Sequence, residues 1–61
     1  MSFEERLKSL MKEKRITQNK LAEKISVSEA SVHHYCCGEN APRMEILIEL
    51  AKFFDVTTDY L

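Results

Sequence analysis

The sequence has little that would interrupt a helix, with one glycine and one proline among its 61 residues. Helix-forming residues dominate instead, which predicts one all-α domain. Its length is near the lower limit for a domain that folds without disulfide bonds or bound metal. The two cysteines are adjacent, at Cys36 and Cys37, so they cannot build a disulfide framework and suit a reducing cytoplasm. No apolar run approaches the roughly 20 residues that span a bilayer, and the sequence starts without a signal-peptide pattern. We therefore expect a cytoplasmic protein without a membrane partner.

A strong excess of positive charge is also missing, because 9 Lys and Arg residues are opposed by 10 Asp and Glu residues. The net charge of −1 therefore does not by itself indicate a nucleic-acid-binding protein. The distribution is more informative, since residues 1–26 carry seven Lys or Arg against four Glu, and residues 27–61 carry two against six Asp or Glu. The first half could face phosphates, whereas the second half could not.

Apolar residues at helical spacing, together with capping residues, predict the secondary structure. Ser2 and Glu5 have the spacing of a capping box, and Gly38 is a natural left-handed end for a helix. The expected fold is a compact five-helix bundle with helices at residues 2–14, 18–25, 29–37, 43–54 and 58–61.

The helical spacing also selects the residues that face the core. The expected buried residues are Phe3, Leu7, Leu10, Met11, Leu21, Ala22, Ile25, Ala30, Val32, Tyr35, Met44, Leu47, Leu50, Ala51 and Phe54, with Tyr60 and Leu61 closing the bundle. Ile46, Ile48 and Phe53 are surplus apolar residues on the fourth helix, of which we expect one to wrap the core edge. Together with Tyr60 they predict a self-association patch, or a contact with a further domain.

The helix at 29–37 is unusual because it has few residues to bury and a largely polar outer side. Val27 lies between Ser26 and Ser28, and this short stretch predicts a tight turn between the helices at 18–25 and 29–37. Two short helices joined in this way, the second with an exposed polar face, indicate a surface that contacts a partner.

Several motifs carry a family resemblance: Thr17-Gln18-x-x-Leu21-Ala22, Val27-Ser28, Val32-x-x-Tyr35, Gly38 with Pro42 four residues on, and Leu50-Ala51 before Val56. At this spacing, from about Phe3 to Leu61, the chain resembles the phage-repressor and Cro-type (XRE-like) helix-turn-helix family. The resemblance implies a lambda-repressor-like domain over residues 1–61, either alone or as the N-terminal part of a longer regulator. It also implies a transcriptional repressor that binds an inverted-repeat operator in double-stranded DNA as a homodimer, with its third helix in the major groove.

The resemblance implies two sets of DNA-contacting residues. The residues expected at base edges are Ser28, Glu29, Ser31, His33 and His34, and those expected at phosphates are Lys14, Arg15, Gln18, Asn40 and Arg43. Glu29 could accept a hydrogen bond from cytosine or could simply stabilise its helix N-terminus, and we favour proximity to a base. The expected dimer interface contains Ile46, Ile48, Phe53 and Tyr60.

The sequence departs from the family pattern where Ser26 and Asp55 replace common glycines. A positive φ at Ser26 would cost about 1 kcal/mol. Glu29 and the two histidines also stand where Gln, Arg or Lys are frequent. These changes keep open a rival interpretation, in which the same fold is a protein-interaction module with weak or no DNA binding.

The segment His33–Cys37 contains four potential metal ligands, His33, His34, Cys36 and Cys37. One helix seldom supplies three tetrahedral ligands, and no second ligand cluster follows elsewhere, so we expect no metal and no cofactor. A metal- or thiol-responsive repressor is the weakest alternative. No nucleophile with a partnered base is apparent, so we expect no catalytic residues and no enzyme.

Overall fold

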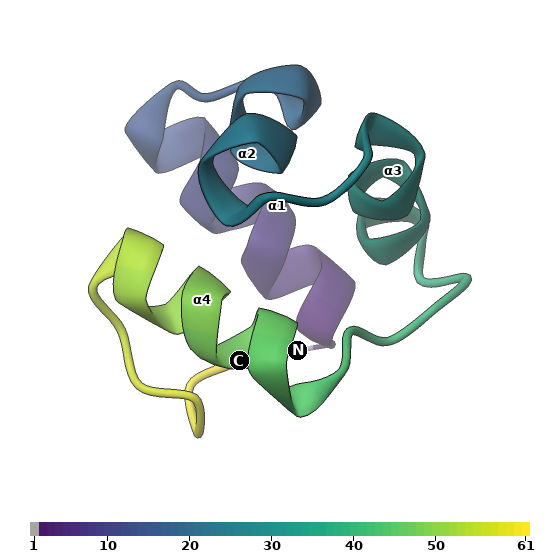
Figure 1. Cartoon of the computed structure of the whole chain (residues 1–61). Coiled ribbons are helices and arrows are strands. Elements are labelled where there is room, and N and C mark those ends of the chain that lie inside the picture. The colour runs from purple at the N-terminus through teal and green to yellow at the C-terminus, as the bar shows by residue number, and fades with distance from the viewer. Residues whose placement is uncertain (1) are drawn as a thin grey trace.

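The computed structural model describes residues 2–61 and contains four helices in this range (Figure 1). They are α1 (Phe3–Lys14), α2 (Gln18–Ile25), α3 (Glu29–Cys37) and α4 (Met44–Phe54). α2 packs against α3 and α4, and α3 also packs against α1. In Figure 1, α3 and α4 lie on opposite sides of α1. The predicted all-α class is confirmed, and no helix of the described range is long and apolar enough to cross a membrane.

The prediction of a fifth helix at 58–61 is wrong. Residues 58–60 form a turn, in which the Tyr60 N–H donates to the carbonyl oxygen and to the hydroxyl of Thr57, both at 3.2 Å. Thr57 therefore caps this segment as its type suggests, but a single i to i+3 bond does not meet the nucleation cost of an α-helix. The segment is held by other contacts, because the Arg6 guanidinium donates to the Tyr60 carbonyl and lies 5.4 Å from the centroid of its ring.

Three of the four helices begin at a hydroxyl residue. Ser2 and Glu5 form the capping box, in which the Ser2 hydroxyl accepts from the Glu5 N–H and the Glu5 carboxylate accepts from the Ser2 N–H. The hydroxyls of Thr17 and Ser28 accept from the backbone N–H three residues later, at 3.2 and 3.1 Å. α4 begins one residue later than predicted, because Arg43 occupies its N-cap and makes no side-chain capping bond.

All four helices end on a residue in the left-handed region. Gly38 has a φ of 77°, and the three other positions are occupied by side chains that pay a steric penalty there. They are Arg15 at 55°, Ser26 at 59° and Asp55 at 57°. The strain expected at Ser26 is therefore present, in the turn between α2 and α3.

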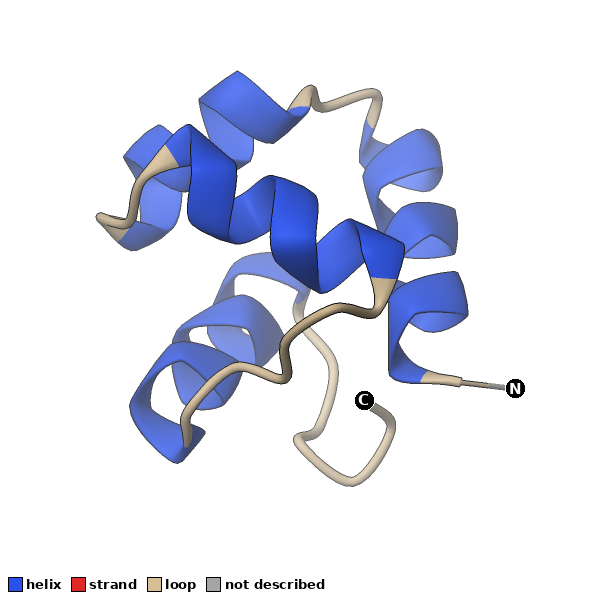
Figure 2. Cartoon of the chain, turned by 90° about the vertical axis from the view of Figure 1, so that its right-hand side faces the viewer, coloured by secondary structure: helices blue, strands red, loops and turns tan. Residues whose placement is uncertain are grey.

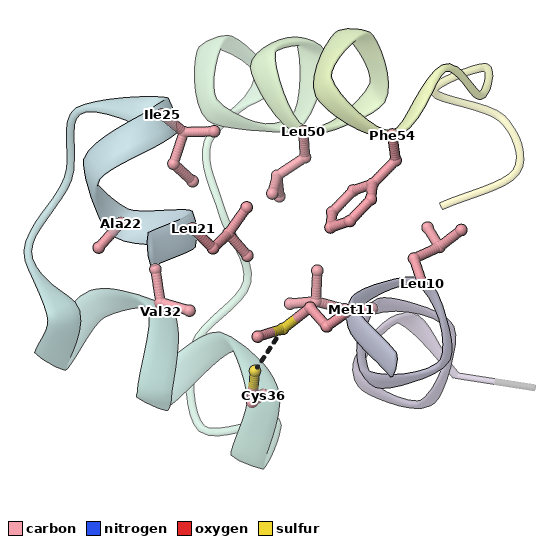
Figure 3. Packing of buried hydrophobic residues seen from close by; sticks show 10 residues of the cluster. Leu10, Met11, Leu21, Ala22, Ile25, Val32, Cys36, Leu50 and Phe54 are labelled. Atoms are coloured by element: carbon pink, nitrogen blue, oxygen red, sulfur yellow. Dashed lines mark hydrogen bonds between the residues drawn. The ribbon is translucent and has the colours of Figure 1, made fainter. Parts of the chain in front are cut away.

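The core receives one fully buried side chain from each helix (Figure 3). These residues are Leu7 of α1, Leu21 of α2, Val32 of α3 and Leu50 of α4. Around them, the other buried residues are Leu10, Met11, Ala22, Ile25, Cys36, Ala51 and Phe54. Because every helix contributes to one cluster, the relative positions of α2 and α3 are determined by the whole bundle.

Four residues that were expected to be buried lie outside the core. Leu47 is only half-buried and is not among the residues packed against the core, and Tyr60 is 44% exposed; the other two are Ala30 and Met44. Ala30 is exposed because it lies about 200° around α3 from the buried Val32, at 100° per residue. Met44 is 64% exposed because it lies six residues before Leu50, which places it about 120° around the helix from the buried stripe. The expectation that one surplus residue of α4 wraps the core edge is also wrong, since Ile46 and Phe53 both pack there.

Candidate nucleic-acid interface

The outer face of α3 is uncovered by any other part of the described chain. Figure 2 looks at this face, with α3 in front of the other helices and the connector to α4 running below it. The helix is held from behind by Val32 and Cys36, which are 0% and 4% exposed. Glu29, His33 and Cys37 are exposed and follow one another at four-residue steps, so they form a single stripe along the helix.

The start of α3 carries three of the residues expected at base edges. The hydroxyls of Ser28 and Ser31 lie 2.9 Å apart and share a hydrogen bond, while Ser28 also caps the helix. Each hydroxyl has one donor and two acceptor positions, so this pair retains some capacity for an outside partner. Glu29 is exposed in the same turn, and no cation of the described chain lies within 4 Å of its carboxylate. Its charge is favourable at the N-terminus of α3.

The two histidines lie in the second half of α3 and have partners within the chain. His33 Nε2 lies 3.5 Å from Cys37 Sγ, and His34 Nδ1 lies 3.2 Å from Glu39 Oε2. Their rings meet edge to face, with centroids 6.0 Å apart. Glu39 was missed by the sequence analysis, although its place directly after a helix-ending Gly38 indicates a chain that folds back toward the helix.

The residues expected at phosphates fall into two groups. Lys14, Arg15 and Gln18 lie at the junction of α1 and α2, where Lys14 and Arg15 are exposed and Gln18 is half-buried. Asn40 and Arg43 are both exposed on the connector that follows α3. The first group therefore spans the end of α1 and the start of α2, and the second group lies on the connector after α3.

The two cysteines have different environments. Cys36 is buried, and its thiol donates toward the Met11 sulfur at 3.6 Å (Figure 3). Burial raises the pKa of the Cys36 thiol above its ordinary value, and the neighbouring Cys37 raises it further. Cys37 is exposed. Cys36 is therefore a small core residue, whereas Cys37 belongs to the surface.

Sequence comparison agrees with this geometry. The helix-turn-helix family profile matches residues 7–61, which include all but the first turn of α1. The chain belongs to the XRE-type helix-turn-helix family. The predicted resemblance is thus confirmed, and α2 and α3 form the helix-turn-helix unit, with Ser26 to Ser28 as its turn.

Three curated relatives of this helix-turn-helix chain carry regulator names. The HTH-type transcriptional activator BcrR of Enterococcus faecalis is 41% identical over 61 residues, covering 100% of this chain and 30% of the relative. Two uncharacterized HTH-type transcriptional regulators of Bacillus subtilis (strain 168) follow. YqaE is 34% identical over 97% of this chain, and YobD is 35% identical over 93%.

The chain spans about half or less of the length of these relatives, with 51% for both Bacillus subtilis proteins. No solved structure gave a significant match to this helix-turn-helix chain.

Proposed function

We propose that the chain binds double-stranded DNA sequence-specifically and regulates transcription, with α3 as the helix that enters the major groove. The observation that carries this proposal is the uncovered outer face of α3 in a helix-turn-helix chain (Figure 2). Its first turn offers Ser28, Glu29 and Ser31, and in helix-turn-helix proteins the start of the second helix contacts base edges. The regulator names of the relatives agree with this assignment.

The members of the base-contacting set differ in the bases that their side chains suit. Glu29 accepts a hydrogen bond from a cytosine amino group, which is the base-edge donor suited to a carboxylate. Ser28 and Ser31 contribute hydroxyl groups that suit more than one base. His33 and His34 lie one turn further along α3, where they would contact base edges next to those met by the first turn.

Affinity in this proposal depends on a second copy of the chain, because the net charge of −1 gives little attraction to phosphates. Met44 and Ile48 are 64% and 38% exposed and lie four residues apart on α4, and Tyr60 is 44% exposed. Together with Ile46 and Phe53 at the core edge, they supply the apolar surface for a homodimer. Such a dimer would bind an inverted repeat with half-sites about 34 Å apart.

Repression was the expectation from the resemblance, and the relative from Enterococcus faecalis is named an activator. The direction of regulation depends on where the operator lies relative to a promoter. A reporter gene carrying the selected operator, with and without the protein, distinguishes repression from activation.

The decisive experiment is selection from a randomised duplex pool at low and moderate salt, followed by sequencing. We expect an enriched inverted repeat, and we expect Glu29→Ala to change the base preference at one position in each half-site. Glu49→Ala is the matched control, because Glu49 is exposed on α4 and lies off α3. No enrichment at either salt would overturn the DNA proposal.

The second candidate is a protein-interaction module, favoured by the exposure of Met44 and Ile48. Ile48→Glu should abolish self-association in sedimentation, and under the DNA proposal it should also abolish binding to the inverted repeat. If Ile48→Glu abolishes association while the wild-type chain selects no DNA, the interaction module is the better description.

A further inference from the structure

Three side chains with metal-binding atoms meet at the C-terminal end of α3. They are His33, Cys37 and Glu39, and one ligand atom from each lies within 4.8 Å of the other two. All three side chains are exposed, so a metal ion from solution can reach them. The combination of imidazole nitrogen, thiol sulfur and carboxylate oxygen is typical of zinc ligands.

The separation of the first two ligands already matches a tetrahedral metal. His33 and Cys37 are four residues apart on α3, and Nε2 lies 3.5 Å from Sγ. Two ligands of a tetrahedral zinc ion, with bonds of about 2.3 Å to sulfur and 2.0 Å to nitrogen, stand about 3.5 Å from one another. A metal ion could therefore bind both atoms without repositioning the helix.

The third ligand is held by the backbone at the end of α3. Gly38 has a φ of 77°, and the Glu39 N–H donates to the His34 carbonyl at 3.0 Å. This hydrogen bond is the mark of a Schellman motif, which turns the chain back over the last helical turn. The backbone of Glu39 is thus fixed relative to Cys37 and does not depend on a flexible loop.

His34 orients the carboxylate of this third ligand. Its Nδ1 lies 3.2 Å from Glu39 Oε2, which leaves the other carboxylate oxygen for a different partner. Outer partners of this kind hold metal-binding side chains in position, and their loss weakens metal affinity about 10–100-fold. His33 and His34 therefore have separate roles, the first as a ligand and the second as a positioning residue.

We propose that His33, Cys37 and Glu39 form a binding site for Zn²⁺ or a chemically similar divalent transition metal. The fourth position is taken by water, and on binding the Cys37 thiol releases its proton to the solvent, with no change in oxidation state. From the sequence alone no metal is expected, because one helix seldom supplies three tetrahedral ligands and no second cluster follows. In the structure, the single residue Glu39 supplies the third ligand from outside the helix. The site shares His33 with the proposed DNA surface, but its formation does not require DNA.

Titration of the full chain with Co²⁺ in a non-chelating reductant tests this site directly. We expect a thiolate-to-cobalt charge-transfer band and intense visible d–d bands, saturating at one metal per chain and abolished by added Zn²⁺. Cys37→Ser should remove the charge-transfer band, and His33→Gln or Glu39→Gln should weaken Co²⁺ binding at least about tenfold. Because the three side chains are exposed, circular dichroism should show that each variant remains folded.

Cys36→Ala is the matched control, because Cys36 is buried and faces Met11. It should retain the charge-transfer band and the Co²⁺ affinity of the wild-type chain. The proposal is overturned if the wild-type chain gives no such band, if Cys37→Ser keeps it, or if one metal is shared by two chains. A failure of the DNA selection would leave these spectra unchanged, so the two proposals can fail separately.

Discussion

The Sγ atom of Cys36 lies 3.6 Å from the Sδ atom of Met11 and links α3 to α1, whereas Cys37, the next residue, is exposed. The two thiols should therefore react at different rates with an alkylating reagent. Burial excludes the reagent from Cys36 and raises the pKa of its thiol, and only the thiolate reacts. We expect mass spectrometry to show Cys37 modified first, with Cys36 protected until the chain unfolds. Equal rates in the native protein, compared with a denatured control, would contradict the burial of Cys36.

The positive φ of 59° at Ser26 predicts a stabilising substitution in the turn between α2 and α3. Ser26→Gly should raise the free energy of unfolding by about 1 kcal/mol, because glycine adopts this conformation without a steric penalty. Urea denaturation measures the change. Ser26→Ala is the control and should give no gain, and Asp55→Gly should give a smaller gain, because aspartate tolerates the left-handed region better than serine. A loss of stability in Ser26→Gly would show that the turn is not strained.

The capping box at the start of α1 predicts a pH-dependent contribution to stability. Hydrogen bonds from the Ser2 side chain and backbone lower the pKa of Glu5 below its ordinary value of 4.5. The folded state therefore favours the ionised form, so this contribution is complete above pH 4.5 and is lost as the pH falls through the lowered pKa. Glu5→Gln should be less stable than the wild-type chain at neutral pH, and the two should converge in acid.

Thermal unfolding of both proteins over a series of pH values measures this difference. In a Ser2→Ala background the effect of Glu5→Gln should shrink, because the partner hydroxyl is gone. A constant difference at all pH values would contradict the ionic contribution of Glu5.

We expect Arg43 to contribute to DNA affinity in a way that does not depend on the base sequence of the duplex. Its side chain is exposed and makes no capping hydrogen bond, so Arg43→Ala should leave α4 intact. If it contacts a phosphate, the substitution should weaken binding to all duplexes alike. It should also reduce the slope of log affinity against log salt by about 2 for the homodimer, because each copy loses one phosphate contact. Fluorescence anisotropy at several salt concentrations measures the slope. Lys52→Ala, in the last turn of α4, is the control and should leave the slope unchanged.

The helix boundaries could be predicted because they depend on bonds between neighbouring residues. Each hydroxyl cap, such as Thr17, accepts from an N–H three residues later, and that spacing is visible in the sequence. A helix was wrongly expected at 58–61 because a cap is likewise a local signal. The cap at Thr57 is present, but it does not show whether enough residues follow to propagate a helix.

The candidate interface could be predicted only in part. The exposure of Glu29 and His33 followed from the shortage of apolar residues in the third helix. The meeting of His33, Cys37 and Glu39 did not, because it depends on the direction in which the chain leaves Gly38.

The sequence by itself determined the class of fold, the helix caps and the family, because hydrophobic period and capping chemistry are local properties. Tertiary structure alone decided how far the core extends beyond the buried stripe of α4, as the packing of Ile46 and Phe53 at its edge shows. It also brought Arg6 to Tyr60 and Met11 to Cys36, which are 54 and 25 residues apart. Such contacts depend on where neighbouring helices lie, and a helical period gives the direction of a side chain but not what stands opposite it.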